Sequence, residues 1–171
     1  RSRRGDGSFF ARTAARWESL RRDLYGSSFL QVALAALLPR ELDVVDLGCG
    51  TGELLATFAP RVRSVVGIDN STEMLGAARR RLESLELPEG RARLLHGDLD
   101  ALPLPNACCD AALLSLVLTY VSKPAKVLAE LARILRPSGR SVVITLLRHD
   151  RDDFRREMHQ IWPGFDPSEL T

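Results

Sequence analysis

Three glycines at alternate positions, directly after a short apolar run, constrain the fold of this chain more than any other feature. Residues 42–47 (LDVVDL) lead into Gly48, Gly50 and Gly52, and a helical pattern follows. Glycines at these positions let the backbone turn sharply and let a ligand reach main-chain N–H groups without meeting a side chain. A tight turn needs only one or two glycines, so three of them after Asp46 at the strand end indicate a ligand-binding loop.

The chain beyond this loop alternates strand and helix patterns. Apolar runs typical of strands occupy residues 42–47, 63–68, 92–96, 110–117 and 140–147. Helical patterns occupy residues 9–24, 29–38, 51–59, 71–86, 124–136 and 148–162. Several strands are continuously apolar, which is typical of strands covered on both faces of a parallel sheet. We therefore predict an α/β fold, a doubly wound domain with a mostly parallel sheet.

Charge and cysteine content narrow the possible functions. Twenty-four Lys and Arg against 22 Asp and Glu give a net charge of +2, too balanced to make nucleic acid the default partner. No apolar run of about 18 residues and no signal peptide is found, so we expect neither a membrane span nor secretion.

Cys108 and Cys109 are adjacent, and a disulfide between them would be strained. We expect reduced thiols in the cytoplasm, and no metal site at these cysteines or at the acids of 150–153.

A second acid stands where it could meet the glycine loop. Asp69 ends the second strand pattern, nineteen residues after Gly50. A carboxylate at this position can accept hydrogen bonds from both hydroxyls of a ribose. Asn70 is expected to cap the next helix, with Glu73 three residues later. The sequence thus predicts that the glycine loop and Asp69 converge on one cavity of the size of adenosine.

Taken together, five segments resemble the successive motifs of class I S-adenosylmethionine-dependent methyltransferases, of the type 11-like kind. They are VVDLGCGTG (44–52), VVGIDNS (65–71), HGDLDALPLP (96–105), CDAALLSLVLTYV (109–121) and LRPSGRSVVITLL (135–147). The resemblance implies a Rossmann-like sheet of order 3-2-1-4-5, with S-adenosyl-L-methionine as cofactor and S-adenosyl-L-homocysteine as product. FFARTAARWESLRRDLYG and RHDRDDFRREMHQIW are also similar to methyltransferase domains that follow an arsenic-repressor-type winged-helix DNA-binding domain.

The same resemblance divides the chain into three parts. It implies an N-terminal arm and helices on the substrate side at 1–40, a cofactor-binding core at 41–150, and a C-terminal helix and truncated tail at 151–171. The strand pattern 140–147 is apolar on both faces, which is unfavourable at a bare sheet edge. We therefore expect C-terminal strands to be missing or supplied elsewhere. Because the chain begins at Arg1 and not at methionine, we expect a fragment, a processed product or the ordered part of a longer protein, which could include a preceding domain.

For the methionine and ribose parts of the cofactor, the resemblance assigns five residues. It places the methionine moiety against Gly48, Gly50 and Gly52, with Asp46 near the ammonium group. Asp69 holds the ribose.

Six further residues are assigned to the adenosine and the sulfonium. Asn70 and Met74 flank the adenosine. Asp98 accepts from the adenine amino group, and the Leu99 N–H contacts a ring nitrogen. Backbone carbonyls of Ser115 and Leu116 lie near the sulfonium. Apolar walls with one acceptor are what an adenine pocket requires.

Catalysis makes few demands on side chains in this reading. Methyl transfer is an in-line displacement at a carbon already activated by the cofactor, so the protein mainly positions the reactants and a base is optional. Thr119, Tyr120 and His149 are the candidate catalytic groups on the substrate side, although His149 could equally form a surface pair with its neighbour. Tyr25 is a candidate cap of the pocket or a core aromatic residue.

Three functions follow from these patterns. The leading hypothesis is methyl transfer to a small-molecule acceptor, in a protein that could form a homodimer. The first alternative is a non-enzymatic S-adenosylmethionine-sensing domain of a transcriptional regulator. The second, an NAD(P)-dependent oxidoreductase, is disfavoured because its fingerprint leaves two residues before the third glycine. Residues 115–118 lack the prolines and aromatic residue of amino-methylating DNA enzymes, so we expect no direct contact with nucleic acid.

Overall fold

The computed structural model describes residues 29–170, which fall into two compact units divided after Leu37. The helix pattern at 9–24 and Tyr25 lie outside the described residues. In the first unit, α3 spans Phe29–Ala35. The helix is shorter than the pattern at 29–38 predicts: Ala35 is its last residue and is buried, whereas Leu37 lies beyond the helix and is 80% exposed.

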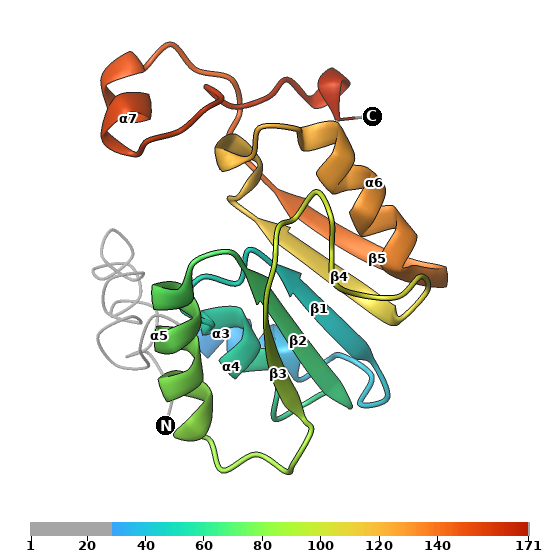
Figure 1. Ribbon diagram of the computed structural model, residues 1–171. Coiled ribbons are helices and arrows are strands. Elements are labelled where there is room, and N and C mark those ends of the chain that lie inside the picture. Colours follow the sequence, from blue (N-terminus) through green and yellow to red (C-terminus); the bar gives the residue numbers. More distant parts are fainter. Residues whose placement is uncertain (1–28, 171) are drawn as a thin grey trace, which may run out of the picture. The chain divides into compact units, whose positions relative to one another are not determined.

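The second unit is built on a parallel sheet with the strand order β3-β2-β1-β4-β5 (Figure 1). Its strands are β1 (Asp43–Leu47), β2 (Ser64–Asp69), β3 (Ala92–His96), β4 (Cys109–Ser115) and β5 (Leu135–Ile144). All four strand pairings are parallel. The predicted doubly wound fold and the order 3-2-1-4-5 are confirmed.

Helices cover both faces of this sheet, as the apolar strands require. On one face lie α4 (Glu53–Phe58) and α5 (Thr72–Glu83), and on the other lies α6 (Pro124–Ile134) (Figure 1). Successive residues of a strand point to opposite faces. Val44 therefore packs in the core beneath α4 and α5, whereas Val45 packs in the core beneath α6. This two-sided burial explains why the central strands lack polar alternation.

The last strand begins earlier than its sequence pattern suggests. Cys109 pairs with Leu135, but Ala111 pairs with Arg140, so the segment 136–139 bulges out of the ladder. The segment Pro137-Ser138-Gly139, which precedes the strand pattern at 140–147, is therefore enclosed within β5. At the edge of the described sheet, Val142 and Ile144 of β5 are about half exposed, whereas Leu135 and Val143 pack against the core.

The chain after β5 forms a loop and not the predicted helix over 148–162. A helix, α7, covers only Asp152–Glu157. Before it, the N–H groups of Arg148 and His149 donate to the carbonyls of Phe165 (3.3 Å) and Pro163 (3.0 Å). These long-range bonds connect the chain before α7 to the chain after it. We call residues 159–165, which bring the chain back toward the sheet, the return segment. No helix among residues 29–170 is long and apolar enough to cross a membrane.

Candidate functional site

The three glycines of the loop after β1 have different structural roles. All have left-handed backbones, with φ of +71° at Gly48, +52° at Gly50 and +74° at Gly52. A Cβ at Gly48 would lie 2.5 Å from Val117, and one at Gly52 would lie 2.9 Å from the Cβ of Ala78. A Cβ at Gly50 would meet nothing within 4 Å. The outer glycines therefore permit close packing, while the backbone of Gly50 borders open space.

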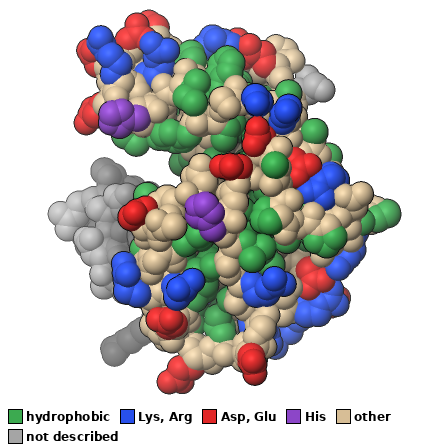
Figure 2. Space-filling view, viewed as in Figure 1, with side chains coloured by type: hydrophobic (Ala, Val, Ile, Leu, Met, Phe, Trp, Pro, Cys, Tyr) green, Lys and Arg blue, Asp and Glu red, His purple; other side chains and the backbone are tan. Residues whose placement is uncertain are grey.

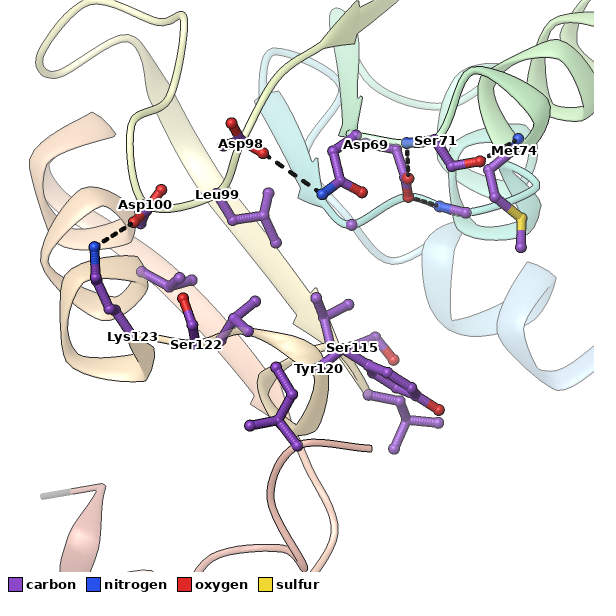
Figure 3. A pocket seen from close by; sticks show the side chains of 18 residues that line it. Asp69, Ser71, Met74, Asp98, Leu99, Asp100, Ser115, Tyr120, Ser122 and Lys123 are labelled. Carbon is purple, nitrogen blue, oxygen red and sulfur yellow. Dashed lines mark hydrogen bonds and ion pairs between the residues drawn. The ribbon is translucent and has the colours of Figure 1, made fainter. Parts of the chain in front are cut away.

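Asp69, at the end of β2, is tied directly to this loop. Its Oδ2 accepts a hydrogen bond from the Gly50 N–H at 2.9 Å, and its Oδ1 accepts one from the Ser71 N–H at 2.9 Å (Figure 3). A carboxylate can accept about four hydrogen bonds, so both oxygens retain capacity for a ligand. The loop and the acid thus meet as the sequence predicts.

The cap of α5 differs from the prediction by one residue. The Oγ of Ser71, not the side chain of Asn70, accepts the Met74 N–H at 3.2 Å. Asn70 instead directs its amide nitrogen toward Oδ1 of Asp98, 3.5 Å away in the loop after β3. Asn70 therefore spans the site and does not cap the helix.

These groups line one cavity of about 690 Å³ at the carboxyl ends of the strands (Figure 3). Such crevices are where ligands bind in open parallel sheets. The predicted site residues among its lining are Gly48, Gly50, Asp69, Asn70, Met74, Asp98, Leu99, Ser115, Leu116 and Tyr120. The lining residues that the sequence analysis missed are Ser71, Asp100, Val117, Val121, Ser122, Lys123, Val127 and Ile161. Most of the missed residues follow β3 or β4, where the positions of strand ends could have indicated them.

The loop after β3 is fixed by an ion pair on α6. Glu130 accepts the Leu102 N–H at 2.7 Å, and Arg133 donates to the Leu104 carbonyl at 2.8 Å. Glu130 and Arg133 also bind each other at 2.7 Å. The segment that presents Asp98 to the cavity is therefore held without any ligand.

Asp46 lies behind the cavity lining. Its side chain is buried, with the residue 3% exposed. Burial and, secondly, the charge of Asp69 raise its pKa to about 7. Gly52, the other predicted residue behind the lining, packs against α5. A cation beside Asp46 would favour its ionised form.

The three candidate catalytic residues occupy different environments. Thr119 and Tyr120 both belong to the short 3-10 helix η2 (Leu118–Tyr120), which directs Tyr120 to the cavity and buries Thr119, 1% exposed. His149 is not in the lining: its ring packs edge-on against Phe154, 5.7 Å away. The structure therefore brings only Tyr120 of the three to the cavity, because consecutive residues of a tight helix point in different directions.

Leu116 has an unusual backbone at the end of β4. Its φ is +57°, a conformation that costs a non-glycine residue free energy. Its N–H donates to the Ile144 carbonyl at 2.7 Å, which holds it there. The strained conformation exposes the Leu116 side chain at the cavity.

Comparison with known proteins identifies the family. A family model described as a methyltransferase domain matches residues 45–143, more than half of the chain. The chain belongs to this methyltransferase domain family. A solved structure that is 31% identical, with a TM-score of 0.55 over 68% of this chain and 52% of that one, is an S-adenosylmethionine-dependent methyltransferase of Mesorhizobium loti, and S-adenosylmethionine is the cofactor that this family membership implies.

Relatives of this methyltransferase domain are longer than the chain. It is 43% identical over 120 residues to an uncharacterized 37.1 kDa protein in transposon TN4556 of Streptomyces fradiae, covering 68% of this chain and 34% of that protein. It is 34% identical over 140 residues to a malonyl-[acyl-carrier protein] O-methyltransferase of Pectobacterium atrosepticum, covering 81% and 51%. The chain thus spans a third to a half of these relatives.

Solved structures share the fold. A proposed methyltransferase of Bacillus halodurans superposes with a TM-score of 0.71 at 21% identity, covering 85% of this chain and 65% of that one. This similarity supports the Rossmann-like architecture of the methyltransferase domain.

Proposed function

We propose that this protein transfers a methyl group from S-adenosylmethionine to a small-molecule acceptor by in-line displacement. The observation that carries the proposal is the convergence of Gly50 and Asp69, 2.9 Å apart, on the cavity at the strand ends. A cavity of about 690 Å³ lies within the range of sites that enclose cofactors and drug-sized ligands. Family membership supports the same activity.

The residues around the cavity fit the cofactor's ribose and adenine. Asp69, already oriented by two N–H donors, would accept the ribose hydroxyls. Leu99 and Met74 offer apolar walls to the adenine, while Asp98 supplies a carboxylate for its amino group. Asn70 lies between the ribose and adenine positions.

At the methionine end, the open space beside Gly50 provides the cradle. No side chain occupies the place of its missing Cβ, so the cofactor could approach the backbone of Gly48 and Gly50. Asp46, just behind, has a pKa of about 7 because it is buried near another acid. The positive ammonium group would compensate this carboxylate, so we assign Asp46 to long-range electrostatic stabilisation of the cofactor.

Chemistry at the methyl group needs position more than acid or base. The cofactor, when bound, supplies a methyl carbon activated by the positive sulfur. The carbonyls of Ser115 and Leu116 would lie near this charge, and Tyr120 would orient the nucleophile of the acceptor. Thr119 and His149, outside the lining, would support the site without touching the reactants.

Two measurements test this proposal. Calorimetric titration should give saturable binding of S-adenosylhomocysteine and none of NADH, whereas tight binding of NADH alone would favour the oxidoreductase. Incubation with methyl-labelled S-adenosylmethionine and a metabolite pool should then label a small molecule. Binding without label in any product would contradict methyl transfer and favour the sensing domain. Attachment to a DNA-binding domain, a homodimer and cytoplasmic location stay predictions.

A further inference from the structure

Large apolar side chains are exposed around one end of the cavity. Leu116 is 52% exposed and Ile161 is 51% exposed, and both line the cavity with the partly exposed ring of Tyr120. Trp162, next to Ile161, is also exposed. In Figure 2, hydrophobic side chains border the hollow beneath the part of the chain that contains α7. Contiguous exposed apolar surface of this kind usually marks a binding site.

The charges of the cavity lie elsewhere. Asp100 pairs with Lys123 at 4.0 Å, and Figure 3 shows both near Asp98, away from Ser115 and Tyr120. Asp69 belongs to the ribose position of the proposed function. Among the described lining residues, the end formed by Leu116, Tyr120 and Ile161 therefore presents no charged side chain.

The return segment is fastened so that Ile161 stays at this end. The N–H groups of Ile161 and Trp162 both donate to the Thr119 carbonyl, at 2.8 and 3.1 Å. The indole Nε1 of Trp162 donates to the Val121 carbonyl at 2.8 Å. Phe165, buried in the core, packs its ring 5.9 Å from that of Trp162. Three hydrogen bonds and a core anchor thus connect the return segment to the chain that follows β4.

Resting on the proposed function, we propose that the methyl acceptor is an uncharged molecule whose apolar body, alkyl or aromatic, lies on Leu116, Tyr120 and Ile161. Burial of these exposed side chains would supply the binding free energy. A charged acceptor would lose hydration at this end without gaining a partner. Trp162 is a positioning residue, because it holds Ile161 through the Val121 carbonyl.

The step balances with the acceptor's own atoms. A lone pair on its oxygen, nitrogen or sulfur forms the bond to the methyl carbon. The carbon–sulfur bond breaks, and its electron pair stays on sulfur, which becomes neutral. The proton of the acceptor heteroatom leaves to water.

The first test uses N-phenyl-1-naphthylamine, an uncharged apolar dye that fluoresces when shielded from water. The protein saturated with S-adenosylhomocysteine should bind it saturably, and Ile161→Ser should weaken this binding at least fivefold. Val142→Ser, which alters an exposed apolar residue on β5, is the matched control and should change it less than twofold. Absence of saturable dye binding, or equal effects of both substitutions, would overturn the inference.

Separate readouts distinguish this inference from the function on which it rests. Affinity for S-adenosylhomocysteine should stay within twofold in Ile161→Ser. If the wild-type protein does not bind S-adenosylhomocysteine at all, the result counts against the proposed function and not against the acceptor assignment alone. The same apolar surface could instead bind a second copy of the chain, and gel filtration tests this alternative. A dimer that dissociates in Ile161→Ser while dye binding stays unchanged would overturn the acceptor assignment.

The role of Trp162 is tested with matched acceptors. Labelled methyl transfer to 4-butylphenol should exceed transfer to 4-hydroxybenzoate, in which a carboxylate replaces the apolar butyl group, by at least tenfold. Trp162→Phe keeps an aromatic ring but removes the indole Nε1 donor. It should therefore raise the KM for 4-butylphenol severalfold and change kcat less than twofold. Preference for the charged acceptor, or a fall in kcat alone, would contradict the proposal.

Discussion

Asp43 and Asp46 stand three residues apart on β1, yet their carboxyl groups lie in opposite environments. At the amino end of the strand, Asp43 accepts hydrogen bonds from Arg63, from Ser64 at 2.7 Å and from Arg136 at 2.9 Å. The hydrogen bond from Arg63, above all, holds its pKa well below the ordinary value. At the carboxyl end, burial raises the pKa of Asp46 to about 7.

The difference between the two carboxyl groups indicates that the amino end of the sheet contributes to stability and the carboxyl end to ligand binding. Charges at the amino end of the sheet are compensated within the chain, by arginines that also bind Asp110. At the carboxyl end Asp100 pairs with Lys123, but Asp46 and Asp69 form no ion pair among the described residues, so we expect a ligand to compensate their charge. Substitutions at the two ends should therefore affect different measurements, and the following predictions, from the largest effect to the smallest, use that contrast.

Asp46→Asn should stabilise the fold while weakening cofactor binding. A folded-state pKa of about 7, against 3.8 for the unfolded chain, means that the folded protein binds more protons between these values. The free energy of unfolding of the wild type therefore falls as pH rises from about 4 to 7, by roughly 1–4 kcal/mol. Asn removes the ionisation, so chemical denaturation should show that gain at pH 8 and little at pH 3.5. A less stable variant at pH 8 would contradict the burial argument.

Asp69→Ala should weaken binding of S-adenosylhomocysteine by roughly 1–3 kcal/mol, through loss of charge-assisted hydrogen bonds to the ribose. Calorimetric titration measures this loss. Asp43→Ala, at the other end of the sheet, is the control and should leave affinity within twofold. Unchanged affinity in Asp69→Ala would reject the ribose assignment.

Asp43→Asn should lower the free energy of unfolding by about 1–2 kcal/mol at pH 7, a modest figure because Arg63 is largely exposed. Since the pKa of Asp43 is lowered in the fold, its contribution is present above about pH 4 and is lost as pH falls further. Denaturation curves of the two proteins should therefore converge toward pH 2. A difference that does not shrink between pH 4 and pH 2 would mean that the ion pairs are not its cause.

The two glycines Gly50 and Gly52 offer the finest contrast. Both substitutions by alanine add a Cβ to a left-handed backbone, at a cost of about 1 kcal/mol. In Gly52→Ala the added Cβ would also collide with Ala78, so this variant should lower the melting temperature more than Gly50→Ala does. Gly50→Ala meets open space and should mainly weaken cofactor binding. An equal loss of S-adenosylhomocysteine affinity in both variants would contradict the different roles of Gly50 and Gly52.

Much of the fold could be predicted from sequence because its signals are local. Continuous apolar runs predicted β1 to β4 within one or two residues, and the glycines at 48–52 indicated where β1 ends. The acid at the end of β2 indicated where the ligand cavity opens.

The failures around the cavity depended on contacts distant in sequence or on which of two neighbouring residues points to the cavity. The amphipathic pattern at 148–162 predicted a helix, but residues 148–149 pair with residues 163–165 and the helix covers only Asp152–Glu157. Ile161 had no local signal, since only that fold-back brings it to the cavity. Thr119 and Tyr120 look equally suitable in sequence, and the turn of η2 alone decides which one reaches the cavity.

A crystal structure of the protein grown with S-adenosylhomocysteine tests the central claim most directly. We predict both ribose hydroxyls within hydrogen-bond distance of the Asp69 carboxylate, the adenine beside Leu99, and the amino-acid end over Gly50. A ligand bound elsewhere, or a ribose turned away from Asp69, would contradict the account.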